Sequence, residues 1–367
     1  YGAGCGSIRF TSLEEELSRA AFYIVTVLTP VDERKNPDLT CLVEATRTVA
    51  RYLKRGDYVV YESTVYPGCT EEVCVPLLEK GSGLKLGADF KVGYSPERIN
   101  PNDSEHTFSN TAKIVSANDG QALDEVARVY AEVVAADLCR ASGIRVAEAA
   151  KMTENVQRSV NIALMNELQR LFSRMGIDMG EVIDMASSKW NFVKYRPGLG
   201  GGHCIPVDPL YLVSAASKLG VEMPVTSSGC AVNDGMAAYV VRSLLGAMGS
   251  DGRGARALLM GVTYKENIDD IRNSRIAEMV GLLEREGMSV DVTDPHADPD
   301  KVYAMYGIRP VPALRPPYDL IVVAVAHDEY RGLDDAYFRS ISRGAALLGD
   351  IRGLYKGRIK SLGYWSL

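Results

Sequence analysis

A cysteine placed directly after a glycine-rich segment is the feature of this chain most suited to chemistry. Cys204 closely follows Gly198-Leu-Gly-Gly-Gly202, and Asp208 comes four residues later. A thiol in this position can attack a carbonyl carbon, and glycines let a substrate approach the main chain closely. The carboxylate can steer a proton or a water molecule. The alternative is a turn with a buried cysteine, because buried cysteines are common.

Two further polar residues lie upstream on one predicted helix. Lys151 and Asn155 are four residues apart, so they share a helical face. Taken alone, this pair is more typical of a solvated helical lysine and an incidental asparagine than of a catalytic pair. His203 invites a dyad with Cys204, but adjacent side chains of an extended chain point apart. A substrate or loop role is therefore expected for His203.

Composition limits the kind of protein. The 367 residues are 46% hydrophobic and 24% charged, which is typical of a globular chain of two or three domains. The net charge of −6 argues against a broad nucleic-acid-binding surface. Seven scattered cysteines and four dispersed histidines predict neither a disulfide framework nor a metal site. No apolar run has membrane-span length and no signal pattern opens the sequence, so we expect a cytoplasmic protein without a membrane partner.

The predicted fold is α/β, with two Rossmann-like, doubly wound domains joined by a long central helix. That helix should run from about Ile144 to Met175, where Gly176 ends it. Apolar runs predict buried parallel strands before and after it. The first set comprises 22–28, 57–64, 91–94 and 113–116, with helices at 39–53, 70–78 and 121–134; the second set comprises 256–262, 289–294, 318–325 and 345–350. The expected domains are 1–141, 142–236, which carries Cys204, and 237–367.

The glycine fingerprint of a dinucleotide site is not found where the first domain should open. Gly2-Ala-Gly-Cys-Gly6 follows no strand and precedes a short β-like stretch, so a turn is the favoured interpretation. We therefore expect that the first βαβ unit of the fold is missing from this sequence. Ligands of such sheets bind beyond the carboxyl ends of the strands. Polar residues at these ends are Thr29, Thr64, Glu97, Lys265, Asp294 and Arg352.

Several short motifs occur in a fixed order over nearly the whole chain. They are Thr29-Pro-Val-Asp32, Glu62-Ser-Thr-Val65, Ser95-Pro-Glu-Arg98, Lys151 with Asn155, Gly200-Gly-Gly-His-Cys204 with Asp208, and Tyr264-Lys265 with Arg272. This sequence resembles the UDP-glucose/GDP-mannose dehydrogenase family. Within the family, Tyr94–Pro101 and Lys189–Phe192 with the cysteine loop are more similar to UDP-N-acetylhexosamine 6-dehydrogenases than to the UDP-glucose enzymes.

The resemblance implies two successive NAD-linked oxidations at C6 of a UDP-sugar, from alcohol to aldehyde to carboxylate. Cys204 would form a thiohemiacetal and then a thioester. Lys151 and Asn155 would stabilise the oxygen that gains negative charge. Asp208 would orient water or accept a proton, and Glu97 and Thr64 would help bind the hydrolytic water.

The resemblance also implies binding residues and partners. The NAD-site residues would be Thr29, Pro30, Val31, Ser63, Thr64, Val65 and Arg272. The UDP-sugar would contact Glu97, Arg98, Lys151, Asn155, Tyr195, Gly198, Gly200, Gly201, Tyr264, Lys265 and Arg352. Trp190 and Phe192 are equally typical of core residues and sugar contacts. A uronic acid for surface polysaccharide is the expected product, and the central helix is expected to form a homodimer.

Two departures from the family pattern keep alternatives open. Pro101 stands where many UDP-glucose enzymes carry an acid, a role that Asp103 could take, and Cys230-Ala231 stands where paired arginines are expected. The alternatives are a UDP-glucose 6-dehydrogenase, a 6-phosphogluconate-type dehydrogenase and a non-catalytic nucleotide-sugar-binding homologue. The second of these gives no reason for Cys204 or for a second α/β domain.

Overall fold

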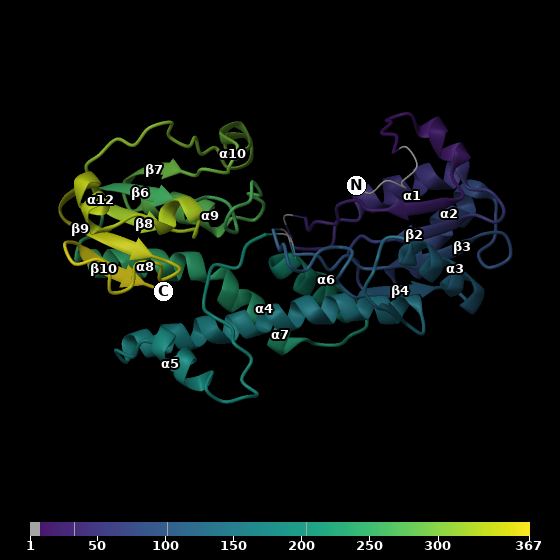
Figure 1. Ribbon diagram of the computed structural model, residues 1–367, viewed down its shortest axis with the longest axis horizontal. Helices are drawn as coiled ribbons and strands as arrows, with labels where there is room; N and C mark the ends of the chain where they lie inside the picture. Colours follow the sequence, from purple (N-terminus) through teal and green to yellow (C-terminus); the bar gives the residue numbers. More distant parts are fainter. Residues whose placement is uncertain (1–7, 33, 101, 203) are drawn as a thin grey trace. The chain divides into compact units, whose positions relative to one another are not determined.

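The computed structural model of the chain describes residues 8–32, 34–100, 102–202 and 204–367. It contains two compact units, and each holds a five-stranded sheet (Figure 1). Unit 1 is Tyr1–Glu154 with Leu210–Val221, and unit 2 is Asn155–Pro209 with Glu222–Leu367. The predicted division into three domains at 141 and 236 stays a prediction. The described residues contain no helix long and apolar enough to cross a membrane.

The sheet of unit 1 has its strands in sequence order, β1-β2-β3-β4-β5. Its predicted strands and helices are present, although several bounds differ and the helix predicted at 70–78 consists of η2 and α2. The helix η1 and the three-residue strand β5 were not predicted. The strands are β1 (Phe22–Val25), β2 (Tyr58–Tyr61), β3 (Lys91–Tyr94), β4 (Lys113–Ala117) and β5 (Leu138–Arg140). The helices are η1 (Glu14–Arg19), α1 (Thr40–Tyr52), η2 (Thr70–Cys74), α2 (Val75–Ser82) and α3 (Gly120–Ala131).

Two expectations for this sheet were wrong. The sheet is mixed, because β4 runs antiparallel to β3 while the other neighbours pair in parallel. Between β3 and β4 the described chain has no crossover helix, and parallel pairing needs such a connection. The first strand is not buried on both faces either. β1 lies at an edge of the described sheet, and Ile24 is 46% exposed while Tyr23 and Val25 are buried.

The sheet of unit 2 is entirely parallel, with the order β10-β9-β8-β6-β7 (Figure 1). Alternate residues of its strands enter two different hydrophobic clusters. In β6, Ala257 and Leu259 join one cluster with the helices α8 (Met236–Met248) and α9 (Arg275–Arg285). Leu258 and Met260 join another cluster with the helix α12 (Asp335–Ile341). Because both faces are covered, the strands read as continuous apolar runs. The strands are β6 (Arg256–Met260), β7 (Ser289–Thr293), β8 (Tyr318–Val323), β9 (Ser342–Asp350) and β10 (Gly363–Ser366).

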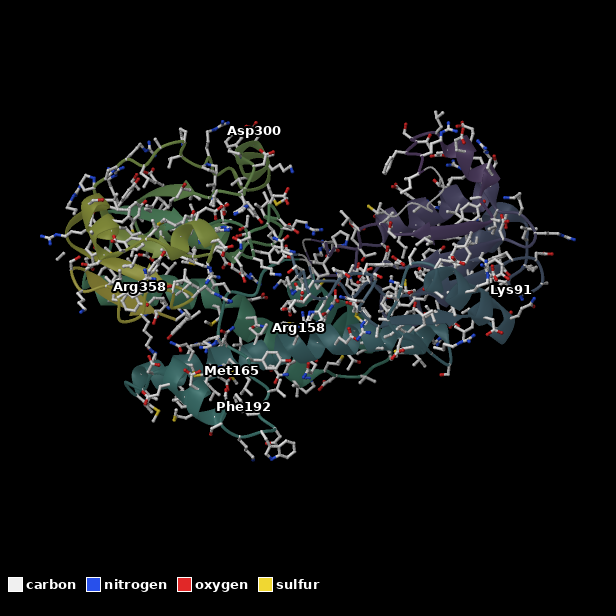
Figure 2. All side chains as sticks on the ribbon, in the orientation of Figure 1. Lys91, Arg158, Met165, Phe192, Asp300 and Arg358 are labelled. Carbon is white, nitrogen blue, oxygen red and sulfur yellow. The ribbon has the colours of Figure 1, made fainter. Side chains whose placement is uncertain are left out.

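The remaining elements of the chain are helices, of which α4 (Ile144–Arg174) is the predicted long helix. Gly176 follows it with φ of 70°, a conformation that favours glycine. In the second half of α4, Met165 packs in a cluster that Phe192 joins (Figure 2). Trp190 is 93% exposed. The other helices are α5 (Met179–Ala186), α6 (Cys204–Lys218), α7 (Pro224–Asp234), α8 (Met236–Met248), α9 (Arg275–Arg285), α10 (Pro299–Tyr306), α11 (Asp328–Arg331) and α12 (Asp335–Ile341).

Candidate active site

The carboxyl ends of β1 and β2 carry the residues predicted to bind NAD. The two strands pair in parallel, so the segments that follow them leave the same edge of the sheet. Thr29 and Ser63 are buried there, and the Ser63 hydroxyl donates to the Val27 carbonyl at 2.7 Å. This bond ties the two segments together. The other predicted residues of this edge are Val65, which is buried, and Pro30, Val31 and Thr64, which are half-buried.

A buried carboxylate on α4 holds the next part of this loop. Glu148 accepts hydrogen bonds from the backbone N–H of Gly68 at 2.6 Å and of Thr70 at 3.0 Å. Burial raises the pKa of Glu148, and these N–H groups lower it by less. Sequence reasoning missed this residue, because one acid among the apolar positions of a helix gives no signal of a loop contact.

The candidate water-binding residue Glu97 lies after β3. One carboxylate oxygen, Oε1, accepts the backbone N–H of Arg98 at 2.7 Å and of Ile99 at 2.6 Å. The other oxygen lies 3.5 Å from the buried ammonium of Lys113, which also lies 3.3 Å from Glu62. The carboxylate is therefore held in one orientation while 41% of the side chain stays exposed.

Arg98 fastens this segment to α4. Its guanidinium lies 2.8 Å from Glu154 and donates to the Ala112 carbonyl at 2.7 Å. These contacts give Arg98 an anchoring role within unit 1, and its predicted contact with substrate stays a prediction.

Lys151 and Asn155 lie four residues apart on α4, and both are buried. The Asn155 amide donates to the fully buried carboxylate of Asp208 at 2.5 Å. Asp208 stands in α6, one turn after Cys204. Within unit 2, the carboxylate predicted to steer a proton therefore also orients the amide predicted to bind an oxyanion.

Cys204 is the first residue of α6 and is exposed. The interpretation as a turn with a buried cysteine is therefore wrong. Unbonded backbone N–H groups and the helix dipole favour a negative charge at a helix start, which is the charge a nucleophilic thiolate carries.

The glycines before Cys204 allow close contact with Tyr264. A Cβ atom at Gly201 would lie 2.9 Å from the Tyr264 Cβ, and one at Gly202 would lie 2.7 Å from its ring. Gly202 also has φ of 83° and accepts a hydrogen bond from Asn273 Nδ2 at 2.9 Å. A larger residue at either position would displace the loop that leads to the thiol.

The segment between β6 and α9 places charge near this thiol. Arg272 pairs with Asp270, and this hydrogen bond together with the Asp270 and Cys204 charges raises the pKa of Arg272. Burial, Asp270 and Cys204 also raise the pKa of Tyr264. Arg272 was predicted to contact NAD, and in unit 2 it shares an electrostatic environment with Cys204.

A cavity of about 280 Å³ lies at the carboxyl edge of the second sheet. Glu266, Ala326 and Arg352 line it from the segments after β6, β8 and β9. The strand order reverses at β6, and such switch points are where ligands bind in open α/β sheets. Arg196 and Arg331 also line the cavity, and sequence reasoning missed both because nothing in their local sequence marks them.

Other predicted substrate residues adjoin this cavity in sequence. Tyr195 precedes the lining Arg196, and its hydroxyl bonds to Gln157 at 3.2 Å. Tyr264 and Lys265 precede the lining Glu266. Gly198 and Gly200 belong to the cysteine loop. His203, Pro101 and Gly2–Gly6 lie outside the described residues, so the interpretations of these positions stay predictions.

Two histidines that are far apart in sequence meet in unit 2. The His296 and His327 rings stack at 4.8 Å, with Glu329 beside them. The dispersed positions of the histidines in the sequence predicted no metal site and gave no indication of this group. His327 Nδ1 accepts the Asn267 N–H at 3.0 Å, so its proton lies on Nε2, which faces Asp294 at 3.2 Å. Both ring nitrogens are engaged, which disfavours metal ligation by His327.

Two α/β sheets, a thiol at a helix start and an arginine-lined cavity are typical of a class of nucleotide-binding proteins with two α/β domains. Family models then identify the family. The NAD binding domain of the UDP-glucose/GDP-mannose dehydrogenase family matches residues 2–134, its central domain matches 145–235 and its UDP binding domain matches 258–357. This chain belongs to that family, and it is an oxidoreductase with NAD as its cofactor.

Individual relatives support the same assignment. The chain is 46% identical over 351 residues to UDP-N-acetyl-D-glucosamine 6-dehydrogenase of Pseudomonas aeruginosa, covering 95% of this chain and 83% of that protein. It is 43% identical over 352 residues to protein CapL of Staphylococcus aureus, with 95% and 83% covered. Among solved structures, UDP-D-ManNAc dehydrogenase of Pyrococcus horikoshii matches with a TM-score of 0.87 at 28% identity, covering 97% of this chain and 83% of that one.

Proposed function

We propose that this enzyme oxidises C6 of a UDP-N-acetylhexosamine to a carboxylate through a thiohemiacetal and a thioester on Cys204. The observation that carries the proposal is the exposed Cys204 at the start of α6, one turn before the buried Asp208–Asn155 hydrogen bond. A thiol, an anion-orienting amide and a proton acceptor are the groups that aldehyde oxidation to an acid requires. We assign the uronic acid product to the synthesis of a surface polysaccharide.

Each candidate catalytic residue of this chain has its own role in the proposed reaction. The Lys151 ammonium and the Asn155 amide stabilise the C6 oxygen as it gains negative charge. The Cys204 thiolate adds to the aldehyde carbon, and after the second oxidation it is the leaving group of the thioester. Glu97 and Thr64 hold the water that attacks the thioester, and Asp208 accepts a proton.

NAD binding fits the edge formed by β1 and β2. When bound, NAD supplies the hydride acceptor for both oxidations. Thr29, Ser63 and Thr64 offer hydroxyl and backbone groups that suit a ribose and an amide. Glu62, which directly follows β2, is engaged by Lys113 and Tyr130, so it does not oppose the cofactor phosphates with a free charge.

The second sheet provides a site for the UDP group. Three guanidinium groups, of Arg196, Arg331 and Arg352, line the same cavity. Arginine binds phosphate oxygens in a bidentate manner, so this cavity suits a diphosphate. The N-acetylhexosamine is favoured over glucose because the relatives at 43–46% identity include two that are named UDP-N-acetyl-D-glucosamine 6-dehydrogenase.

A substrate panel tests this function. Purified protein is given UDP-GlcNAc, UDP-GalNAc, UDP-ManNAc or UDP-glucose, and NADH and uronate are measured. We expect two NADH per UDP-sugar consumed, because four electrons leave C6. Cys204→Ser should abolish uronate formation, whereas Cys139→Ser, which alters an exposed cysteine on β5, should retain it. Full uronate production by Cys204→Ser contradicts the mechanism.

The same panel separates the alternatives. Preference for UDP-glucose identifies the UDP-glucose 6-dehydrogenase. A non-catalytic homologue would bind UDP-sugar and produce no NADH with any sugar of the panel. If no NADH is produced, equilibrium titration with NAD shows whether the protein has lost NAD binding or has kept it and lost only catalysis.

We also propose that two copies of the chain associate through α4. Leu164 and Leu171 are seven residues apart on this helix, so they share a face, and they are 48% and 51% exposed. Apolar side chains on one helix face are typical of a contact surface. Light scattering should give the mass of a dimer, and Leu164→Glu with Leu171→Glu should give a monomer; a wild-type monomer contradicts this association.

A further inference from the structure

Asn166 of α4 binds the main chain of the cysteine loop from inside the protein. The side chain is fully buried. Its Oδ1 accepts the Gly198 N–H at 2.8 Å, and its Nδ2 donates to the Gly198 carbonyl at 3.1 Å. One amide thus satisfies both backbone groups of a single loop residue, as a neighbouring strand would.

The orientation of this amide is fixed by a chain of hydrogen bonds. Asn233 Nδ2 donates to the Ser159 carbonyl at 3.0 Å, and a carbonyl can only accept. The Oδ1 of Asn233 therefore faces Asn166, whose Nδ2 donates to it at 2.9 Å. With Nδ2 turned that way, Oδ1 of Asn166 is left to accept from Gly198. The network has one consistent polarity, and all its members are buried.

The opposite end of the loop is held separately. The Gly202 N–H donates to the Arg272 carbonyl at 3.2 Å, and the Gly202 carbonyl accepts from Asn273. The five residues from Gly198 to Gly202 are thus bound at both ends, to α4 and to the segment before α9. The cavity-lining Arg196 and Pro197 lie directly before this loop, and Cys204 lies shortly after it.

We propose that Asn166 is a positioning residue, which holds the glycine loop in the register that presents both the arginine-lined cavity and Cys204 to one substrate. The role of Cys204 and the use of UDP as the probe of the cavity both rest on the function proposed above. Small displacements of a reacting group lower the rate of a positioned reaction steeply. A loop released at Gly198 should therefore bind UDP less tightly and present the thiol in many orientations.

The informative substitution is Asn166→Asp, which keeps the size of the side chain and removes both N–H donors. The carboxylate then faces the Gly198 carbonyl and Asn233 Oδ1, two acceptors that it can only repel. Asn161→Asp is the matched control. It lies on the same helix, and among the described residues its amide bonds only to the carbonyl of Gln157 within that helix. Asn233→Ala is the second variant, because it removes the acceptor that orients Asn166 Nδ2 without touching the loop.

Three measurements decide the proposal. They are UDP affinity by calorimetry, the rate of Cys204 alkylation by iodoacetamide, and kcat and KM for uronate formation. For Asn166→Asp we expect UDP affinity to fall about tenfold and kcat to fall about a hundredfold. Alkylation of Cys204 should lose its protection by UDP. Asn233→Ala should show the same changes at smaller size, and Asn161→Asp should match the wild type.

The proposal is overturned if UDP affinity and kcat of Asn166→Asp stay within about twofold of the wild type. If Asn166→Asp does not fold, Asn233→Ala alone decides, and wild-type values for it overturn the proposal. Failure of the proposed function is a different result. In that case Cys204→Ser still makes uronate, while UDP affinity still falls in Asn166→Asp.

Discussion

Both units use a buried carboxylate to hold the loop after a strand, and the two carboxylates differ in the number of their donors. In unit 1, Glu148 accepts two backbone N–H groups from the loop that follows β2. In unit 2, the acid after β7 is Asp294, and it accepts four, from Val262, Thr263, His296 and Ala297. It also faces the Nε2 of His327.

The pKa values of these two acids shift in opposite directions. Burial is the largest cause in both and raises the pKa of each. For Glu148 burial prevails. For Asp294 the hydrogen bonds from His327, Val262 and His296 outweigh burial and hold the pKa well below its ordinary value. The number of donors therefore decides whether a buried acid is a stable anion.

This difference has a functional consequence. A strand-end acid in an α/β sheet commonly binds the ribose of a dinucleotide. Asp294 is occupied instead by the loop that carries Tyr264 and Lys265, because it binds the Val262 and Thr263 N–H groups directly. In the second sheet this acid fixes the loop of the proposed UDP site and is not available to a ribose.

Replacing Asp294 should have the largest effect. Asp294→Asn places an NH₂ group among N–H donors and leaves at least two of them without an acceptor, which should destabilise unit 2 by about 3–5 kcal/mol. Urea unfolding followed by tryptophan fluorescence measures this loss. Asp298→Asn is the control, because Asp298 caps the exposed start of α10 and asparagine caps a helix about as well as aspartate, so this variant should lose less than about 0.5 kcal/mol. Equal losses for both variants would contradict the comparison.

Replacing Glu148 should have a smaller effect. Glu148→Gln removes a buried charge that the protein disfavours and keeps one acceptor for the loop, so the change in unfolding free energy should stay below about 1 kcal/mol. NAD affinity should fall severalfold, because one N–H of Gly68 or Thr70 loses its partner. A loss as large as that for Asp294→Asn would show that Glu148 is a stable anion as well.

The pH dependence of stability should separate the two acids. Asp294 has a lowered pKa, so its contribution is present above the ordinary value of 3.8 and is lost as the pH falls through its folded value. Glu148 has a raised pKa, so its contribution is present below 4.5 and is lost as the pH rises through its folded value. Unfolding free energies of wild type, Asp294→Asn and Glu148→Gln between about pH 3 and 7 test both signs.

The smallest change in unfolding free energy is expected for His296, whose ring stacks on that of His327. His296 pairs with Glu329 at 3.2 Å, and these side chains are 29% and 51% exposed. His296→Gln should change the unfolding free energy by less than about 0.5 kcal/mol, because exposed ion pairs contribute little. His327→Gln should cost more, since His327 is fully buried and binds Asp294. A larger loss for His296→Gln than for His327→Gln would show that the contact of His296 with Glu329 matters more than the contact of His327 with Asp294.

Local patterns explain what could be predicted from the sequence. Continuous apolar runs predicted β6 and β8, because covered strands carry apolar residues on both faces. Periodicity predicted α4, whereas the helix that holds both Cys204 and Asp208 was not predicted. The order of the motifs gave the family.

Contacts between distant segments explain what could not be predicted. The direction of β4 depends on a connection without a helix, which leaves no periodic signal. Asn166 meets Gly198 across 32 residues, and Asp294 meets His327 across 33. Nothing in the local sequence of an asparagine on a helix distinguishes a loop anchor from a surface residue.

Pro209 gives the two helices that connect the units different mechanical properties. α4 and α6 pass from one unit to the other at Glu154–Asn155 and at Pro209–Leu210. Pro209 has no N–H, so the carbonyl of Ile205 lacks its helical hydrogen bond, whereas α4 contains no proline. α6 therefore bends more easily than α4. The connection from unit 1 to the turn of Cys204 through α6 is thus the more flexible of the two, and the connection to Asn155 through α4 is the stiffer.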